Sequence, residues 1–425
     1  MLDIRRLRTE TESVKRALAR RGVDGLVEAV DEVLGVDELR RSMLAEVNEL
    51  KAQRNEVSKK IGELKREGAD AADPIEKMKG VGERISELDG KVTQADERIQ
   101  ALLLVTPNPP LEEVPEGGVE NNVIVRTVGS PVDFGFEPKP HWDLASALNI
   151  LDLPRGSKLS GSGFPVLKGM GARLQRCLID FMLDMHTEEH GYTELRVPYL
   201  VTRETLTATG QLPKFADDSY QTERDDLWLI PTAEVPVTNL HADELLGAED
   251  LPVRYTAYSP CFRREAGAAG ADTRGLLRVH QFDKVELVRY ETPERSREAL
   301  EELTAEAESV LQRLDLHYRV VTLATGDLGF SAAMTYDLEV WAPGVGQWLE
   351  VSSCSTFGDF QARRAGIRYR PAQGEKPRFV HTLNGSALAL PRLMVAILET
   401  YQQSNGTVRV PQALQERIGQ STIEP

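Results

Sequence analysis

The chain has 425 residues, which is enough for two or three domains with a large apolar core. Hydrophobic residues make up 41% and charged residues 28%, and no stretch approaches the ~20 apolar residues of a membrane span, so we expect a globular protein without a membrane partner. The net charge of -16 argues against nucleic acid, but residues 1–110 hold 20 Lys and Arg against 22 Asp and Glu. The acidity therefore belongs to residues 111–425, and basic surface on the smaller segment can still meet phosphates.

The N-terminus and the cysteines indicate the compartment. The first residues, MLDIRRLR, carry charges where a signal peptide needs an apolar core, so we do not expect export. Cys177, Cys261 and Cys354 are far apart and form no C-x-x-C pair, which indicates neither a disulfide framework nor a cysteine-based zinc site. We therefore expect a cytoplasmic protein.

Residues 27–104 are highly charged, almost free of aromatics, and carry apolar residues at heptad spacing. These residues are Met43, Val47, Leu50, Val57, Ile61 and Leu64 in the first half, and Ile75, Met78, Val81, Ile85, Leu88, Val92, Ala95, Ile99 and Leu102 in the second. Heptads are typical of helices that wind around each other, and Glu67–Pro74 predicts a break between two of them. We expect an antiparallel hairpin of two ~35-residue helices, each about 50 Å long.

The chain changes character after the hairpin. Thr106–Pro110 (TPNPP) predicts a linker. Beyond it, Asn122–Val128 and Leu316–Thr322 predict strands, whereas residues 170–190 and 293–313 predict helices. The sequence has no regular βαβ alternation and no glycine-rich nucleotide fingerprint, so a Rossmann or P-loop site is not supported.

The first of three segments with candidate chemistry is Gly171–Leu200. It predicts a long helix, a stop at Gly191, and a strand that ends in Arg196-Val197-Pro198. Plain core packing explains this segment equally well.

The second segment, residues 259–288, predicts a strand, a Gly/Ala-rich loop and a return strand. Two-residue alternation puts Arg263 and Glu265 on one face of the first strand, and Phe282 and Glu286 on one face of the second. An Arg, a carboxylate and an aromatic ring on one sheet face can bind a phosphate, the adenine amino group and the adenine ring. The alternative is an exposed hairpin with ordinary salt bridges.

The third segment, Leu383–Arg392, runs into the apolar helix Leu393–Tyr401. An Arg at the start of a buried helix needs an anionic partner. A triphosphate is one candidate, and a structural ion pair is the alternative.

In this order the three segments resemble the signature motifs of class II aminoacyl-tRNA synthetases. Together with the heptad arm, four more segments make essentially the whole chain similar to the bacterial type of the seryl-tRNA synthetase family: Thr209–Phe215 (TGQLPKF), Pro231–Pro236 (PTAEVP), Phe262–Gly267 (FRREAG) and Glu350–Ser355 (EVSSCS). The first motif is weakly specific, whereas the others combined with the arm are highly specific.

The resemblance implies an α+β fold, in which a six- or seven-stranded antiparallel catalytic sheet flanked by helices follows the N-terminal coiled-coil hairpin. It implies a tRNA-binding domain over residues 1–110, with its arm at about 27–104, and a catalytic domain over residues 111–425. The implied activity is that of a homodimeric serine–tRNA ligase, which activates L-serine with ATP to seryl-adenylate and transfers serine to the 3′ end of tRNA(Ser). The arm is expected to contact the tRNA, and tRNA(Sec), where present, is expected to be charged as well.

The resemblance also assigns the site, motif by motif. The implied catalytic residues are Arg263, at the α-phosphate, and Arg392, at the γ-phosphate. The implied ATP-binding residues are Arg263, Arg264, Glu265, Val279, Phe282, Glu350, Val351, Ser352, Ser353 and Arg392. The implied serine-binding residues are Thr232, Ala233, Glu234, Arg263, Glu286, Asn384 and Ser386. Glu350 and Ser353 are expected to hold Mg²⁺ with ATP, because their oxygens suit a hard cation.

Within this assignment, Glu265 should contact adenine, Phe282 should stack on it, and Val279, at a position where a polar residue is common, should act through its backbone. No zinc is expected, because the cysteines lack the grouping that the zinc-using branch of the family needs. His280 and His381 are expected to be structural or stacking residues, since the chemistry is mainly positioning and charge stabilisation.

Two other functions stay open at this point. A relative that loads an amino acid onto a carrier protein would lack the long arm, which is present here. A non-catalytic interaction protein with a decayed core would have lost its charged site residues first, but all of them are intact.

Overall fold

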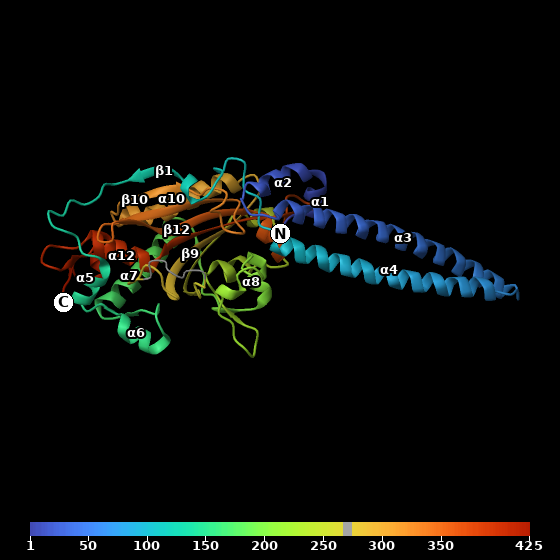
Figure 1. The fold of residues 1–425 in the computed structure, drawn as a ribbon, viewed down its shortest axis with the longest axis horizontal. Helices are drawn as coiled ribbons and strands as arrows, with labels where there is room; N and C mark the ends of the chain where they lie inside the picture. The colour runs from blue at the N-terminus through green and yellow to red at the C-terminus, as the bar shows by residue number, and fades with distance from the viewer. Residues whose placement is uncertain (267–273) are drawn as a thin grey trace. The chain divides into compact units, whose positions relative to one another are not determined.

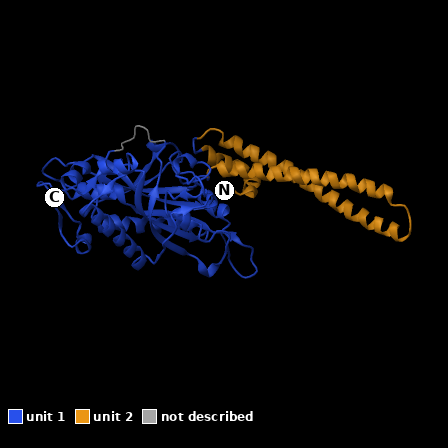
Figure 2. Cartoon of the chain, turned by 90° about the horizontal axis from the view of Figure 1, so that it is seen from below, with its two compact units in different colours: residues 1, 20–22, 108–425 blue, residues 2–19, 23–107 orange. Residues whose placement is uncertain are grey.

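The computed structural model describes residues 1–266 and 274–425, and the chain divides into two compact units (Figure 2). The arm unit consists of residues 2–19 and 23–107, and the sheet unit consists of residues 1, 20–22 and 108–425. Most of the Gly/Ala-rich loop of the second motif, including Gly267, lies outside the described residues. Among the described residues, no helix combines the length and the apolar character that a bilayer crossing requires.

The arm unit contains the predicted helical hairpin (Figure 1). The long helices are α3 (Leu26–Arg66) and α4 (Ala72–Val105), preceded by the short helices α1 (Ile4–Thr9) and α2 (Thr11–Ala19). The break between α3 and α4 is shorter than predicted, because α4 takes Pro74 into its first turn. Proline is tolerated there, since the first N–H groups of a helix have no intrahelical partner anyway.

The heptad seam is tighter near the base of the arm than near its tip. Val47, Ile85, Leu88, Ala95, Ile99 and Leu102 are buried among half-buried Met43, Leu50 and Val92, whereas toward the turn Val57, Ile61, Leu64, Met78 and Val81 are all half-buried. Ile75 is 45% exposed, so its predicted place in the seam is wrong. The seam therefore holds the two helices together most firmly over the half that lies away from the turn.

The sheet unit is built on an eight-stranded sheet in the order β1-β10-β11-β12-β15-β9-β8-β4. Its strands are β1 (Val123–Val128), β4 (Thr193–Glu194), β8 (Val253–Phe262), β9 (Gln281–Glu291), β10 (Tyr318–Thr322), β11 (Met334–Ala342), β12 (Gln347–Gly358) and β15 (His381–Ala389). All neighbouring pairs are antiparallel except β4 and β8. The antiparallel sheet is thus confirmed, but it is wider than the predicted six or seven strands.

The strand predicted to end in Arg196-Val197-Pro198 is wrong in its end point. β4 ends at Glu194, and the chain runs irregularly to the short strand β5 (Leu200–Val201), which pairs with β6 (Trp228–Leu229) outside the main sheet. The other short strands are β2 (Leu151–Asp152), β3 (Val166–Leu167), β7 (Leu245–Gly247), β13 (Arg368–Arg370), β14 (Arg378–Phe379), β16 (Val408–Arg409) and β17 (Thr422–Ile423).

Among the described residues, the three longest helices of the sheet unit pack against the main sheet. They are α7 (Met170–Glu188), α10 (Ser296–Arg313) and α12 (Leu390–Thr400), and the first two confirm the helices predicted there. The remaining helices are α5 (His141–Ala147), α6 (Leu153–Ser160), α8 (Arg203–Thr209), α9 (Glu234–Thr238), α11 (Phe360–Ala365) and α13 (Gln412–Ile418).

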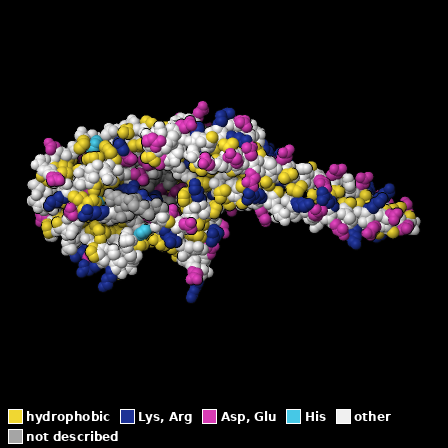
Figure 3. All heavy atoms as spheres, viewed as in Figure 1, with side chains coloured by type: hydrophobic (Ala, Val, Ile, Leu, Met, Phe, Trp, Pro, Cys, Tyr) yellow, Lys and Arg dark blue, Asp and Glu magenta, His cyan; other side chains and the backbone are white. Residues whose placement is uncertain are grey.

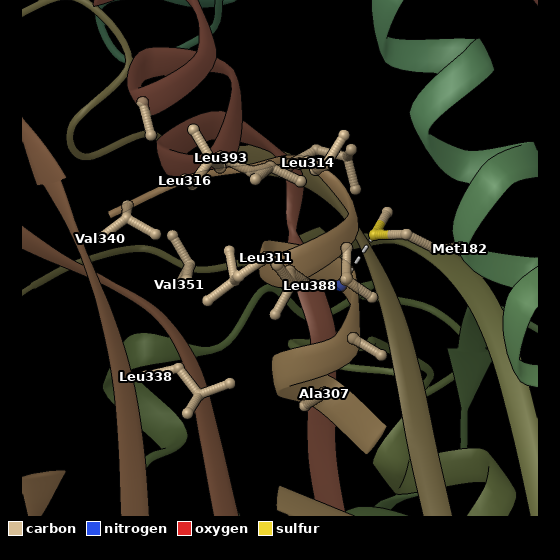
Figure 4. Packing of buried hydrophobic residues seen from close by; sticks show 14 of the residues in the cluster. Met182, Ala307, Leu311, Leu314, Leu316, Leu338, Val340, Val351, Leu388 and Leu393 are labelled. Atoms are coloured by element: carbon tan, nitrogen blue, oxygen red, sulfur yellow. Dashed lines mark hydrogen bonds between the residues drawn. The ribbon is translucent and has the colours of Figure 1, made fainter. Parts of the chain in front are cut away.

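The core lies where these helices meet the sheet. Leu311 of α10, Val340 of β11, Val351 of β12 and Leu393 of α12 converge there (Figure 4). Burying each such side chain contributes about 1.5–3 kcal/mol, so this face of the sheet is held firmly. Because side chains alternate along a strand, the same strands direct polar side chains to their other face.

Candidate functional site

Two cavities adjoin in the sheet unit, one of about 590 Å³ and one of about 210 Å³. The side chains that line both are Arg263, Glu265, Lys284, Glu350 and Ser386. The predicted residues that line only the small cavity are Val279, Phe282 and Arg392, and those that line only the large one are Thr232, Glu234, Ser353 and Asn384. The structure therefore brings most of the predicted site residues together around one shared wall.

Arg263 stands at this wall with its donors uncommitted. β8 ends at Phe262, so Arg263 and Glu265 follow the strand instead of sharing its face, and the predicted alternation is wrong for this pair. The Arg263 guanidinium lies 5.1 Å from the centre of the Phe282 ring, a cation–π distance. Through its side chain, Arg263 forms no hydrogen bond or ion pair with the described residues. Its N–H donors are thus available to an anion.

A β-bulge explains why Glu350 and Ser353, three residues apart, face the same way. The register between β11 and β12 shifts at Leu338/Glu339 and leaves Val351 without a partner. The Ser353 hydroxyl donates to Glu350 Oε1 at 3.3 Å, whereas Val351 points into the core (Figure 4).

Arg392, in the first turn of α12, connects two segments that line the small cavity. Its Nη1 donates to the carbonyl oxygen of Glu350 at 2.9 Å and to Glu350 Oε2 at 3.1 Å, and its Nε donates to the Leu277 carbonyl at 3.1 Å. The sequence left open whether Arg392 binds a triphosphate or forms a structural ion pair. Arg392 does form an ion pair, with Glu350, but Glu350 itself lines the small cavity. The backbone of Val279 makes no hydrogen bond within the described chain, which suits a backbone contact with a ligand.

Two buried carboxylates influence each other at the large cavity: Glu234 lines it, and Glu286 lies behind its lining. Glu234 starts α9 and is 6% exposed, and Glu286 on β9 is 1% exposed. Burial, followed by the negative charge of Glu286, raises the pKa of Glu234 to about 7, although the Gln361 amide donates to Glu234 at 2.7 Å. Such an excess of negative charge suits an ammonium ligand.

Glu286 supports the polar side chains in front of it. Its carboxylate accepts a hydrogen bond from the Asn384 amide at 2.7 Å, contacts the Ser386 hydroxyl at 3.5 Å and pairs with Lys284. Register places Ser386 directly opposite Glu286 on the paired strands β15 and β9. The sheet therefore fixes the spacing of these groups.

The oxygens around Glu350 fit the expected Mg²⁺. Burial, followed by the charge of Glu350, raises the pKa of Asp337 on β11 well above its usual range. Asp337 Oδ1 is buried and has no hydrogen-bond partner in the described chain. Mg²⁺ usually takes one or two carboxylates together with substrate phosphates. Within residues 1–266 and 274–425 no group of three or more His, Cys, Asp or Glu forms a self-sufficient metal site.

Five of the predicted residues line neither cavity: Ala233, Arg264, Glu286, Val351 and Ser352. Ala233, Val351 and Ser352 are fully buried, so a ligand could reach them only through their backbone. The Ser352 hydroxyl donates to the Ser386 carbonyl at 2.6 Å. Arg264 lines a separate cavity, which His280 also lines. His381 lines neither cavity, and burial lowers its pKa.

Sequence reasoning missed two polar wall residues and one end of the large cavity. Lys284 lies between Phe282 and Glu286 at the same two-residue spacing, so strand alternation was a sufficient signal for it. Asp337 needed the pairing of β11 with β12, which places it opposite Ser353. The missed end of the cavity is built from residues 209–219 and 323–332, which are far apart in sequence.

Comparison with known proteins identifies, over the whole chain, the family that the sequence motifs resemble. Residues 1–110 match the model of the seryl-tRNA synthetase N-terminal domain, and residues 215–401 match that of the class II tRNA synthetase core domain (G, H, P, S and T). Serine–tRNA ligases of Gemmatimonas aurantiaca and Geobacillus kaustophilus are 54% and 55% identical to it, with each pair of chains covered completely.

Solved structures agree with these sequence matches. The seryl-tRNA synthetase of Pyrococcus horikoshii complexed with ATP superposes with a TM-score of 0.95 at 41% identity, over 100% of both chains. The cytoplasmic serine–tRNA ligase of Naegleria fowleri in complex with AMP gives 0.86 at 31% identity, over 97% of this chain and 95% of the other.

Proposed function

The chain belongs to the seryl-tRNA synthetase family, and from this premise we propose how its residues divide the work of an ATP-dependent serine–tRNA ligase. The observation that supports the proposal is the wall shared by the two cavities. The small cavity takes ATP, and the large one takes serine. The α-phosphate and the serine carboxylate then meet at Arg263, Lys284 and Glu350.

The ATP side uses the residues that the sequence assigned. Phe282 stacks on adenine, Glu265 accepts its amino group, and the backbone of Val279 adds a contact. Arg392 binds the γ-phosphate, as the family resemblance implies, and it lines the small cavity. Arg264, Val351 and Ser352 contribute through their backbones, since their side chains lie elsewhere.

Mg²⁺ with ATP is held by Glu350 and Ser353, with Asp337 beside them. The ion would supply positive charge to the phosphates. The chain's own part is to present these oxygens from two paired strands, and the bulge at Val351 is what aligns Glu350 with Ser353. Binding a cation here also relieves the buried carboxyl of Asp337.

The serine side is a polar pocket. Glu234 binds the ammonium group, supported by Glu286, and Thr232, Asn384 and Ser386 face the hydroxyl, with Ala233 contributing backbone. An analogue without the hydroxyl leaves such buried groups unpaired, which can cost up to about 10⁴-fold in kcat/KM. Alanine should therefore be activated far more slowly than serine, and threonine should be excluded mainly by its size.

The chemistry needs positioning and positive charge more than proton transfer. A serine carboxylate oxygen bonds to the α-phosphorus as the bond to pyrophosphate breaks, and the free N–H donors of Arg263 stabilise the charge that develops. In the second step a hydroxyl of the terminal adenosine of tRNA attacks the seryl carbonyl, and AMP leaves.

In this proposal the arm unit binds the tRNA. Its helices form a seam of their own, and most of their basic residues are exposed, as contact with tRNA(Ser) requires. The homodimer and tRNA(Sec) as a second acceptor, which the family resemblance implies, and the cytoplasmic location, which the cysteine pattern and the N-terminal residues indicate, complete the proposal.

Serine-dependent exchange of pyrophosphate into ATP, followed by charging of purified tRNA(Ser), tests the proposal. We expect both reactions, with alanine at least a thousandfold below serine in the exchange. Comparable kcat/KM values for alanine and serine would contradict the assigned pocket. Exchange without any charging of tRNA(Ser) would contradict the acceptor.

A further inference from the structure

The large cavity is bigger than serine requires. Its volume of about 590 Å³ is in the range of about 300–1,000 Å³ that encloses drug-sized ligands. The residues assigned to serine and Mg²⁺ form one part of its lining. Another part comes from Thr209–Ser219 and Leu323–Ala332, to which the proposed function assigns no role, and the Gln361 amide joins this part to Glu234. This part includes the TGQLPKF segment, whose function the family resemblance leaves unassigned.

The segment Gln211–Phe215 is held as one rigid turn in this part. α8 ends at Thr209 and is followed by Gly210, whose φ of +91° lets the chain reverse, and the Phe215 N–H donates to the Gln211 carbonyl at 2.8 Å. The carbonyl of Thr209 accepts hydrogen bonds from the Ser331 hydroxyl at 2.9 Å and from the Gln361 amide at 3.3 Å. The turn is thus anchored to the elements that line the rest of the cavity.

Two aromatic rings and one cation gather on this turn. The rings of Phe215 and Phe330 both line the cavity and meet edge to face, with centroids 6.4 Å apart. The Lys214 ammonium lies 5.0 Å from the Phe330 centroid and 5.7 Å from that of Phe215. Lys214 is exposed and does not itself line the cavity, and within the described chain it forms no ion pair or hydrogen bond.

Two further features point to the ligand's chemistry. The Gln211 amide lines the cavity and makes no side-chain hydrogen bond to described residues, so it is available to the edge of a base. Partial burial, followed by the charge of Arg21, lowers the pKa of Lys214, so an anion at the rim would stabilise its charged form.

A ring surface, an amide and a cation are the groups that bind single-stranded nucleotides. The lining of the cavity carries carboxylates that repel a phosphate: Asp218, Glu234, Glu265, Asp327, Asp337 and Glu350. A nucleotide would therefore put its ribose inward and keep its phosphate at the rim, beside Lys214.

We propose that the Gln211–Phe215 turn and Phe330 form the subsite for the 3′-terminal nucleotide of the tRNA, with the Lys214 ammonium on its phosphate. The proposal rests on the function given above and adds the place where the acceptor end is held. The rings contact the base or ribose, Gln211 reads the base edge, and the ribose hydroxyl points to the serine end of the cavity.

The test compares two steps in Lys214→Met, which removes the charge and keeps the length. Pyrophosphate exchange should keep its serine and ATP KM values within about twofold. Single-turnover transfer from enzyme-bound seryl-adenylate to tRNA(Ser) should slow at least tenfold, and Lys214→Arg should recover most of the rate. Lys376→Met, at an exposed position of the same unit, is the matched control and should leave both steps unchanged.

A double-mutant cycle of tRNA binding tests whether Lys214 contacts the last nucleotide of the tRNA. Wild-type protein should bind tRNA(Ser) that lacks its last nucleotide several-fold more weakly than intact tRNA, and Lys214→Met should lose this difference, because the two changes remove the same contact.

Transfer at the wild-type rate, or equal discrimination between the two tRNAs, would overturn the subsite. A raised serine KM in the exchange would instead assign Lys214 to the serine pocket, which also overturns it. Failure of the wild-type protein to charge tRNA(Ser) at all would refute the proposed function, so the two failures are distinguishable.

Discussion

The sheet unit and the arm unit hold their charged residues in opposite ways. In the sheet unit Glu234 and Glu286 are buried, and each is fixed by hydrogen bonds from neighbouring strands or helices. In the arm unit Lys and Arg alternate with Asp and Glu along an open surface (Figure 3). A buried charge changes the energy of its site by several kcal/mol, whereas an exposed pair contributes at most about 1 kcal/mol. Function should therefore depend on single side chains in one unit and on groups of side chains in the other.

The arm itself repeats this contrast on a smaller scale. From the base to beyond the middle of the arm, cations pair with acids across and along the helices, as Arg98 does with Glu32 and Lys51 with Asp89. Toward the tip the cations form no ion pair with described residues: Arg54, Lys59, Lys60, Lys65, Arg66, Lys77 and Lys79. The tip thus has the charges that are available to a phosphate backbone.

The largest effect is expected from removing the arm, which separates the activity of the sheet unit from that of the arm unit. Replacing residues 36–104 with a short linker should leave seryl-adenylate formation nearly intact, because every residue assigned to ATP or serine lies after Pro198. The same variant should lose tRNA charging. Pyrophosphate exchange and aminoacylation are measured side by side. Survival of both would show that the arm does not read the tRNA, and loss of both would show that it supports the sheet unit.

The second-largest effect is expected from a single substitution in the sheet unit. Arg263→Ala should lower the rate of pyrophosphate exchange by about 10²–10³-fold, because one preorganised donor is worth roughly 3–4 kcal/mol in the transition state. Thermal unfolding should be unchanged, since the side chain makes no hydrogen bond to the described chain. Arg155→Ala, on the exposed face of α6, is the control. Exchange near the wild-type rate would remove Arg263 from the reaction.

The two units were not equally predictable from the sequence. The arm follows from a local repeat, since heptad spacing from Met43 to Leu102 predicts two paired helices without any tertiary information. The repeat failed at Ile75, which lies in the first turn of α4 beside the break and is 45% exposed. Pro74 does not mark the break, because proline is tolerated in the first turn of a helix and α4 begins before it.

The site in the sheet unit depends on pairings between distant segments. The motif residues were identified by resemblance, and most of them line the two cavities. What the sequence could not supply was the bulge at Val351, the approach of Asp337 to Glu350, and the meeting of Phe215 with Phe330. Each of these depends on register or on long-range packing, which no local spacing encodes.

Titration of Glu234 gives a smaller, pH-dependent test of the buried charges. Its pKa of about 7 means that the carboxyl is neutral in acid and loses its attraction for the serine ammonium. The serine KM in pyrophosphate exchange should therefore rise below pH 7, by up to tenfold per pH unit, and stay level above it. Glu234→Gln should show a high KM with little dependence on pH between 6 and 8. A wild-type KM that is flat over this interval would contradict the assignment.

The same group links stability to pH. Its folded-state pKa lies above the ordinary value of 4.5, so the protonated carboxyl favours the fold. This stabilisation is complete below about pH 4.5 and is lost as pH rises through about 7, with a total on the order of 3 kcal/mol. Serine should therefore raise the melting temperature more at pH 8 than at pH 6, because its ammonium compensates the ionised carboxylate.

The smallest effect is expected from one lysine at the tip of the arm. Lys59→Ala removes one exposed charge, so tRNA binding should weaken only a few-fold, and the slope of log K against log salt should fall by about 1. Combined replacement of Lys59, Lys60 and Lys65 should lower the slope by about 3 while leaving pyrophosphate exchange unchanged. Lys51→Ala is the matched control, because the Lys51 ammonium already has a partner in Asp89 at 3.3 Å, and its loss should change the slope least. An equal loss of slope for Lys51→Ala and Lys59→Ala would mean that ion pairs within the arm do not decide which cations meet the tRNA, and the contrast between base and tip would then have no bearing on binding.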